Sequence, residues 1–199
     1  MLHFEREVVD VELINEMLKL FHHVNLGLND EDGFPYVVPV NFGYEIKDDK
    51  LYVYTHFTKR GHKLDLMRKD SRVCLEFSAF NDFEEYKYKG HRHDYRSIIA
   101  KGIIKIVDAK EDYETFKKGY NLLYICNHRK IVPLEDRPQM PPMYIGVIEC
   151  DMKNVTAKSE FPIRTKEDVP FLDVFSLEKD ETPFDISDII KDRKSRMKK

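Results

Sequence analysis

The chain has 199 residues, and its 33 Lys and Arg against 36 Asp and Glu give a formal net charge of -3 at pH 7 with neutral histidines. This near balance argues against a dedicated nucleic-acid-binding domain, which is usually strongly basic. A hydrophobic share of 42%, with 13 Phe and 11 Tyr, excludes a disordered chain and predicts one globular domain with an appendage.

Three cysteines, Cys74, Cys126 and Cys150, lie far apart and form no Cys-x-x-Cys pair. A sparse and odd number of cysteines argues against a disulfide framework and is typical of a reducing compartment. No run approaches the roughly 18 apolar residues of a membrane span, and the N-terminal residues are charged where a signal peptide is apolar. We therefore expect a cytoplasmic protein that binds neither membrane nor nucleic acid.

The first part of the chain predicts a helix and then a meander of three strands. Asp10 is a favourable N-cap, and apolar residues follow it at helical spacing: Leu13, Ile14, Met17, Leu18 and Phe21. The helix is expected to end near His22 and His23, whose positive character suits a helix C-terminus. Strands are predicted over residues 24–28, 34–46 and 51–56. Pro35 and Pro39 cannot donate to a ladder, so the middle strand should lie at a sheet edge or carry a bulge.

Further along, the pattern predicts helices over residues 61–70 and 110–126. It also predicts strands over residues 71–80, 95–107 and 143–150, the last of which continues toward Lys158. Six short strands without regular strand–helix alternation predict a mainly β fold with peripheral helices, a six-stranded antiparallel barrel. The sequence lacks Gly-x-Gly-x-x-Gly and Walker A motifs. Residues 159–199 form a more polar extension, and a short helix is predicted to start near Thr182–Asp185.

One junction joins a strand end, a basic loop and a helix start: residues 54–63, Tyr-Thr-His-Phe-Thr-Lys-Arg-Gly-His-Lys. The free N–H groups of a helix N-terminus favour an anion, whereas the cations Lys59, Arg60, His62 and Lys63 disfavour the helix itself. A bound phosphate would resolve this conflict through charge-assisted hydrogen bonds. The alternative is a solvated basic loop that pairs with Asp65 and Asp70.

The other polar clusters give no catalytic constellation. His91 and His93 have a spacing that metal ligands use, but no third ligand accompanies them, which favours a solvated loop. Cys126-Asn127-His128 lacks an orienting partner for a nucleophile. The sequence therefore assigns no metal site and no catalytic side chain.

Several segments in one colinear order carry a family resemblance: Gly33–Val40, Leu51–His56, Gly61–Asp65, Asp70–Cys74 and Tyr95–Gly102. Over roughly residues 5–158 the chain resembles the pyridoxamine 5′-phosphate oxidase-like FMN-binding proteins, and among them the nitroimidazole-resistance (Nim) type. The resemblance implies a split β-barrel over residues 1–158. It also implies a homodimer with one FMN in each of two clefts at the subunit interface. The extension at 159–199 has no counterpart.

The resemblance also implies which residues contact FMN. Pro39, Val40 and Asn41 match the strand beside the isoalloxazine edge, and Thr55 and His56 match the strand end near the ribityl chain and phosphate. The positions that clamp the phosphate correspond to His62 and Lys63, of which Lys63 is the stronger candidate because a partly buried dianion needs a cation. The adjacent strand that approaches the cofactor supplies Arg96 and Ser97.

We therefore predict an FMN-dependent oxidoreductase that takes a hydride from NAD(P)H and reduces small electron acceptors such as nitroaromatic compounds. Residues 191–199 lack the Arg-x-x-x-Arg-Leu-type segment of a true pyridoxamine phosphate oxidase, which argues against vitamin B6 oxidation. Two alternatives stay open. One is a non-catalytic FMN-binding module for storage or sensing, and the other is a haem-binding split barrel with His91 or His93 as an axial ligand.

Overall fold

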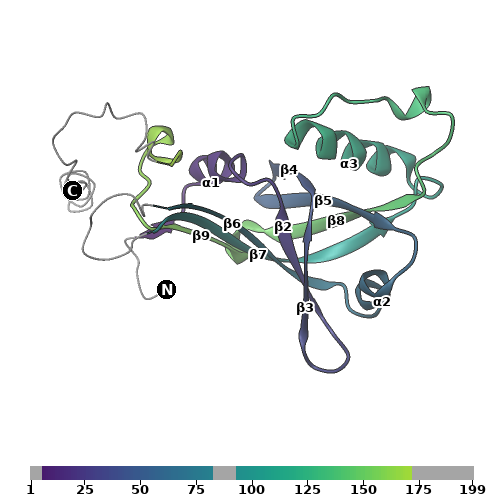
Figure 1. Cartoon of the computed structure of the whole chain (residues 1–199), viewed down its shortest axis with the longest axis horizontal. Coiled ribbons are helices and arrows are strands. Elements are labelled where there is room, and N and C mark those ends of the chain that lie inside the picture. Colours follow the sequence, from purple (N-terminus) through teal and green to yellow (C-terminus); the bar gives the residue numbers. More distant parts are fainter. Residues whose placement is uncertain (1–5, 83–92, 172–199) are drawn as a thin grey trace. The chain divides into compact units, whose positions relative to one another are not determined.

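The computed structural model describes residues 6–82 and 93–171 and shows a mainly antiparallel β fold with few helices (Figure 1). The contacts divide the chain into two units. Within the described residues, the first comprises 6–20, 78–82, 93–98 and 156–171, and the second comprises 21–77 and 99–155. His91, the side chain of His93 and the predicted helix near residue 182 lie outside the described residues. No helix in the described part is long and apolar enough to cross a membrane.

The second unit contains most of the sheet. Its own elements are β2 (Val24–Asn29), β3 (Pro35–Val40), β4 (Phe42–Lys47), β5 (Lys50–Thr58), α2 (His62–Lys69), α3 (Tyr113–Cys126) and β8 (Met143–Asp151), with 3-10 turns at Leu134–Asp136 and Met152–Asn154. Two long strands, β6 (Arg72–Asp82) and β7 (His93–Val107), belong to both units. The strands hydrogen-bond in the order β3-β2-β6-β7-β8-β5-β4.

The predicted strand at 34–46 is interrupted at Asn41, and this break shapes the sheet. β3 and β4 are the two ends of the hydrogen-bonded order, yet only Asn41 separates them in the chain. The ends must therefore lie beside each other, so the sheet curves. The ring of Phe42 on β4 accordingly packs edge-on against that of Phe77 on β6, with 5.0 Å between the centroids. The expectation that the prolines mark an edge is confirmed, because β3 is an end strand.

The described residues form nine strands where six were predicted. All six predicted segments are strands. The additional ones come from the break at Asn41 and from two short strands, β1 (Glu7–Val8) and β9 (Val155–Ser159). β9 continues the predicted pattern toward Lys158 after a 3-10 turn, and it pairs with both β1 and β7.

The first unit is organised around a helix and a buried arginine. Asp10 caps α1 (Val11–Leu18), accepting hydrogen bonds from the backbone N–H groups of Glu12 and Leu13 at 2.8 and 3.1 Å, as its sequence predicts. Arg96 is fully buried and pairs with Asp94. Its guanidinium also donates to the carbonyl oxygens of Val169, Asp168 and Pro170 at 2.9, 3.2 and 3.2 Å. Arg96 thereby fixes the segment that follows the 3-10 turn at Lys166–Asp168.

In the second unit, α3 covers β4, β5 and β8 (Figure 1). Phe116, Tyr120 and Leu123 of α3 pack on Tyr54 and Ile145 of the sheet. The helix approaches β4 most closely at Gly43, where an added Cβ would lie 2.5 Å from the carbonyl carbon of Leu122. Only glycine allows this approach, so Gly43 sets the position of α3 and of the turn that follows it.

Replacing Gly43 with Ala should lower the free energy of unfolding by about 3 kcal/mol, because the backbone of α3 has to move to admit the methyl group. Urea unfolding followed by circular dichroism measures this change. Gly27→Ala is the matched control. Its added Cβ would be 3.3 Å from the nearest atom, the carbonyl oxygen of Cys74, so a smaller loss is expected. Equal losses in the two variants would contradict the assigned role of Gly43.

Candidate functional site

Strand register brings residues from three parts of the second unit to one place. Val24 is opposite Val40 in the β2–β3 pair, and Phe42 is opposite Thr55 in the β4–β5 pair. Asn41, between β3 and β4, therefore has His23 beside it on one side and His56 on the other. The break in the predicted strand thus creates a polar site where the two ends of the sheet meet.

These residues line a cleft of about 290 Å³ with no acidic residue among them: His23, Pro39, Val40, Asn41, His56 and Lys63. Five of the nine residues predicted to contact a cofactor are therefore brought together, although their roles stay predictions. His23 is an addition. Sequence analysis had placed it at a helix C-terminus, which is wrong because α1 ends at Leu18.

Lys63 is the half-buried cation of this cleft. The β5–α2 loop that positions it is fixed by a hydrogen bond of 2.8 Å from the Thr58 hydroxyl to the carbonyl oxygen of Arg60. Gly61, with a φ of 119°, then turns the chain into α2. The Lys63 ammonium lies 5.8 Å from the ring centroid of Phe57, and no carboxylate in the described residues forms an ion pair with it. Burial lowers the pKa of Lys63, so an anion nearby would stabilise its charged form.

The helix that carries Lys63 also lacks an N-terminal cap. No side chain in the described residues accepts a hydrogen bond from the first turn of α2, and its N-cap is Gly61. The first N–H groups of a helix point outward and attract negative charge. Lys63 and the start of α2 therefore present a positive ammonium and free amide donors in the same region.

Two other basic residues of the loop, Lys59 and His62, have protein partners, whereas Arg60 is exposed. Lys59 pairs with Asp108 at 2.5 Å, and the Nε2 of His62 lies 2.7 Å from a carboxylate oxygen of Asp30. This hydrogen bond to Asp30 raises the pKa of His62. Neither cation pairs with Asp65 or Asp70, as the alternative of a solvated loop had assumed. His62 does not line the cleft, so Lys63 is the cation of the basic loop that faces it.

The surroundings of His56 favour its neutral form. The largest effect on its pKa is partial removal of the ring from water, and the positive charges of Lys63 and Arg129 add to it. All of these effects lower the pKa of His56 and so favour its neutral imidazole. Arg129, which follows α3, was missed by sequence analysis. The sequence does not indicate that Arg129 is near His56, because nothing in it shows that the end of α3 lies near the end of β5.

The remaining predicted residues are not among those that line the cleft. Thr55 is fully buried on the opposite face of β5 from His56, and its hydroxyl has no hydrogen-bond partner within residues 6–82 and 93–171. Arg96 and Ser97 belong to β7 in the first unit, where the Arg96 guanidinium is committed to Asp94 and to backbone carbonyls. In the described part of the chain, no group of three or more His, Cys, Asp or Glu could hold a metal ion.

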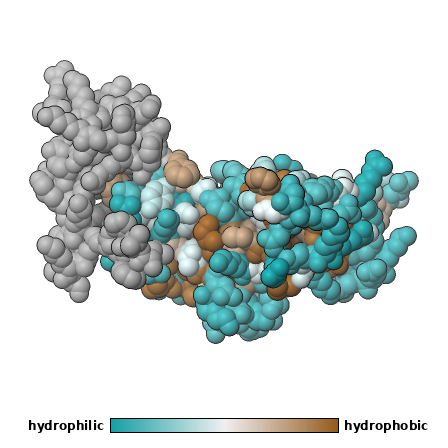
Figure 2. Space-filling model, turned by 90° about the horizontal axis from the view of Figure 1, so that it is seen from below, coloured by the Kyte–Doolittle hydropathy of each residue, from teal (hydrophilic) through white to brown (hydrophobic). Residues whose placement is uncertain are grey.

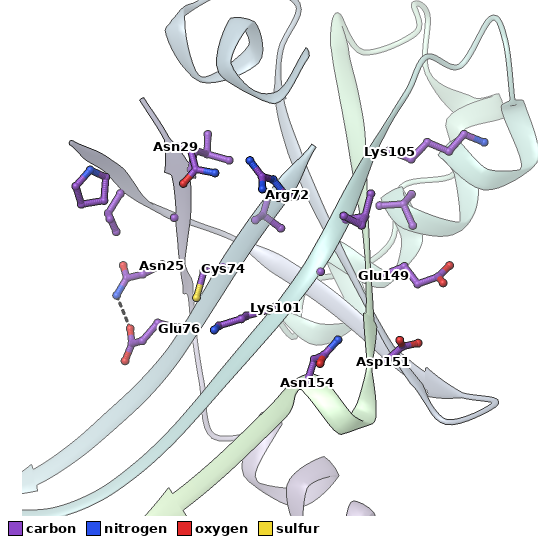
Figure 3. Close-up of a pocket in the computed structure, with 18 residues that line it drawn as sticks. Asn25, Asn29, Arg72, Cys74, Glu76, Lys101, Lys105, Glu149, Asp151 and Asn154 are labelled. Carbon is purple, nitrogen blue, oxygen red and sulfur yellow. Dashed lines mark hydrogen bonds between the residues drawn. The ribbon is translucent and has the colours of Figure 1, made fainter. Parts of the chain in front are cut away.

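A larger hollow of about 960 Å³ lies on the outer face of strands β2, β3, β6, β7 and β8 (Figure 3). Asn25 donates a hydrogen bond of 2.7 Å to Glu76 at one side of this hollow, and Lys101 points toward Cys74 and Glu76. Apolar residues of the face include Val37 and Ile103, which are more than half exposed. None of the nine predicted site residues lines this hollow.

Comparison with known proteins identifies a family and a fold. The family model for pyridoxamine 5′-phosphate oxidase matches residues 10–158. A solved structure of a candidate 5-nitroimidazole antibiotic resistance protein from Bacteroides thetaiotaomicron is similar with a TM-score of 0.63. The two proteins are 23% identical, and the match covers 77% of this chain and 86% of that one.

Two other solved structures share the fold at lower similarity. The flavocytochrome Anf3 from Azotobacter vinelandii is 17% identical over 94% of this chain and 92% of that one, with a TM-score of 0.52. The FAD and haem binding protein from Mycobacterium smegmatis is 17% identical over 83% and 79%, also with a TM-score of 0.52. No protein with a curated description matches this chain.

Replacing Lys63 with Gln should raise the pKa of His56, because loss of a neighbouring positive charge makes protonation of the imidazole easier. NMR titration of the His56 ring protons in the ligand-free protein measures this pKa. Lys69→Gln is the control, since Lys69 lies on the same helix and pairs with Glu31. An unchanged His56 pKa in Lys63→Gln would show that the two side chains do not share the cleft.

Proposed function

Because the chain belongs to the pyridoxamine 5′-phosphate oxidase family, we propose that it is a cytoplasmic FMN-binding flavoprotein with a split-barrel fold. We propose further that it is an NAD(P)H-dependent oxidoreductase that reduces small electron acceptors such as nitroaromatic compounds. One observation carries the cofactor assignment. Lys63 is a half-buried cation without an acidic partner in the described residues, in a cleft lined by residues that the family resemblance assigns to FMN.

The donors at the start of α2 fit the phosphate of FMN. The Lys63 ammonium would supply a charge-assisted hydrogen bond, and the first N–H groups of α2 would supply further donors. His62 would take part through its backbone N–H, because its imidazole is bound to Asp30. The absence of acidic residues from the cleft lining means that no protein carboxylate there would repel the phosphate.

The edge strand fits the flavin ring. β3 ends the hydrogen-bonded order, so one side of its backbone is not used by another described strand. Pro39, Val40 and Asn41 would border the ring there, while Thr55, Arg96 and Ser97 stay predictions. The cleft of about 290 Å³ is at the lower limit of ligand pockets, which hold roughly 300–1,000 Å³. It would therefore take part of FMN, and a second copy of the chain would complete the site.

When bound, FMN supplies redox chemistry that side chains lack, since it accepts a hydride from NAD(P)H and passes electrons to an acceptor. The chain's own residues hold and orient it. Lys63 would neutralise the phosphate, and neutral His56 would offer a hydrogen bond in the cleft without adding a permanent charge. The nitroaromatic acceptor is proposed from the sequence resemblance and is in keeping with the description of the Bacteroides relative.

Steady-state NAD(P)H oxidation by the FMN-loaded protein, measured with a panel of acceptors, tests the enzymatic function. Turnover with nitroaromatic compounds would support it. Tight FMN binding without turnover under any acceptor would instead favour the storage or sensing module. The haem alternative depends on His91 or His93, which the structure does not describe, and a Soret band on haem titration would reveal it.

Replacing Lys63 with Ala should weaken FMN binding by about 10- to 100-fold, because hydrogen bonds to charged groups contribute roughly 1.5–3 kcal/mol. Quenching of FMN fluorescence on titration with protein measures the affinity. Lys69→Ala is the matched control, since it removes an equal charge from the far end of the same helix. An affinity unchanged by Lys63→Ala, or equally reduced in both variants, would refute the assigned role of Lys63.

We also propose that the chain forms a homodimer through the outer face of the sheet that Figure 3 shows. Two-fold symmetry sets a surface against a second copy of itself, so the surface must be self-complementary. This face carries exposed apolar residues and charges of both signs: Arg72, Lys101 and Lys105 against Glu76, Glu149 and Asp151. Figure 2 shows one face of the molecule, on which hydrophobic residues lie in separate patches among hydrophilic ones.

Replacing Ile103 with Glu should convert the dimer to a monomer, because the new carboxylate would be buried against its symmetry mate. Light scattering after size exclusion measures the mass. Ile125→Glu is the control, since Ile125 lies on α3 and is 54% exposed against 53% for Ile103. A monomeric wild-type protein, or a dimer that survives Ile103→Glu, would contradict this interface.

A further inference from the structure

The turn after α3 is attached to the cleft. Asn127, the C-cap of α3, donates through its side-chain amide to the carbonyl oxygen of Phe42 at 3.1 Å and to that of Leu123 at 2.7 Å. Phe42 directly follows Asn41, which lines the cleft. The end of α3 is therefore fixed within one residue of the cleft wall, although it is far away in the sequence.

The chain then reverses its direction at His128, and the next residue is the cation Arg129. His128 adopts a left-handed conformation with a φ of 53°, and the Arg129 N–H donates back to the carbonyl oxygen of Tyr124 at 2.9 Å. Non-glycine residues seldom adopt this conformation, so the turn is a specific feature of the backbone. Among the described residues, Arg129 has no ion-pair partner, and Arg129 itself is exposed. Its guanidinium is thus available to a ligand.

We propose that Arg129 is a second anion ligand of this cleft and binds the cofactor phosphate together with Lys63. This role rests on the proposed function. A phosphate monoester carries about two negative charges at pH 7, so Lys63 alone would leave roughly one of them unbalanced. A guanidinium binds phosphate through paired N–H groups, which adds geometric selectivity to charge.

The charges around His56 support this arrangement. The groups that face His56 are Lys63 from α2, Arg129 from the turn after α3 and His23 from the segment before β2. After partial burial, the positive charges of Lys63 and Arg129 both lower the pKa of His56, so both cations act on the same imidazole through their charge. Lys63 lines the cleft, and the Asn127–Phe42 hydrogen bond holds the turn that carries Arg129 next to the cleft wall. Two cations at or beside one small site without acidic lining residues favour a ligand with two negative charges.

Arg129 also follows a helix C-terminus, where any cation interacts favourably with the helix dipole. That purely structural role would affect stability and not ligand affinity. Lys130 separates the two roles, because it carries the same charge one residue further along the chain. A dipole effect would be similar for Arg129→Gln and Lys130→Gln, whereas a ligand contact would distinguish them.

The experiment compares FMN and inorganic phosphate binding by the wild-type protein with binding by Arg129→Gln, Arg129→Lys and Lys130→Gln. We expect Arg129→Gln to weaken FMN binding about tenfold, Arg129→Lys to restore part of the loss, and Lys130→Gln to bind as the wild type does. Equal affinities in Arg129→Gln and wild type, or equal losses in Arg129→Gln and Lys130→Gln, would overturn the proposal while leaving FMN binding intact.

A second measurement requires no FMN. In the ligand-free protein, Arg129→Gln should raise the pKa of His56 in an NMR titration, and Lys130→Gln should leave it nearer the wild-type value. An unchanged His56 pKa in Arg129→Gln would overturn the proposal. If the wild-type protein binds no FMN, the proposed function fails. Binding of inorganic phosphate then tests whether Arg129 belongs to an anion site. Phosphate binding that Arg129→Gln weakens supports the anion site, and a wild-type protein that binds no phosphate overturns it.

Discussion

A single residue joins the two ends of the sheet, and the rest of the second unit depends on this covalent constraint. Because Asn41 alone connects β3 to β4, these two strands at opposite ends of the hydrogen-bonded order have to lie beside each other. The curvature that results encloses the aromatic contact of Phe42 with Phe77. It also sets the end of β3 beside the end of β5, which is why a cleft forms there.

The cleft concentrates positive charge that the protein does not neutralise in its described part. Elsewhere in the same loop, Lys59 and His62 have Asp108 and Asp30 as partners. Burying a cation without a partner costs free energy, and functional sites are where proteins commonly tolerate that cost. The cost is moderate here because Lys63 is only half-buried and packs on the ring of Phe57.

Local sequence patterns predicted the helices and strands well, but they could not predict contacts between residues that are far apart in the chain. The N-cap at Asp10, the edge strand with two prolines and all six predicted strand segments were found because each depends on nearby residues. The family resemblance is confirmed by the match over residues 10–158. The break at Asn41 was missed because residues 34–46 keep strand propensity throughout. At this break the chain passes from one end strand of the sheet to the other, which only the topology of the whole sheet explains. Arg129 was missed for a related reason, since the contact of Asn127 with Phe42 spans 85 residues.

The prolines of β3 have a consequence for association between chains. Pro35 and Pro39 pair with Asn29 and Asn25 of β2, and a proline fits such a ladder only where its nitrogen points away from the partner strand. The free border of β3 therefore lacks two of its alternate amide donors, with Val37 between them. A foreign strand that tried to extend the sheet would find few groups to bond with, so the border resists fibril growth and remains open to small molecules.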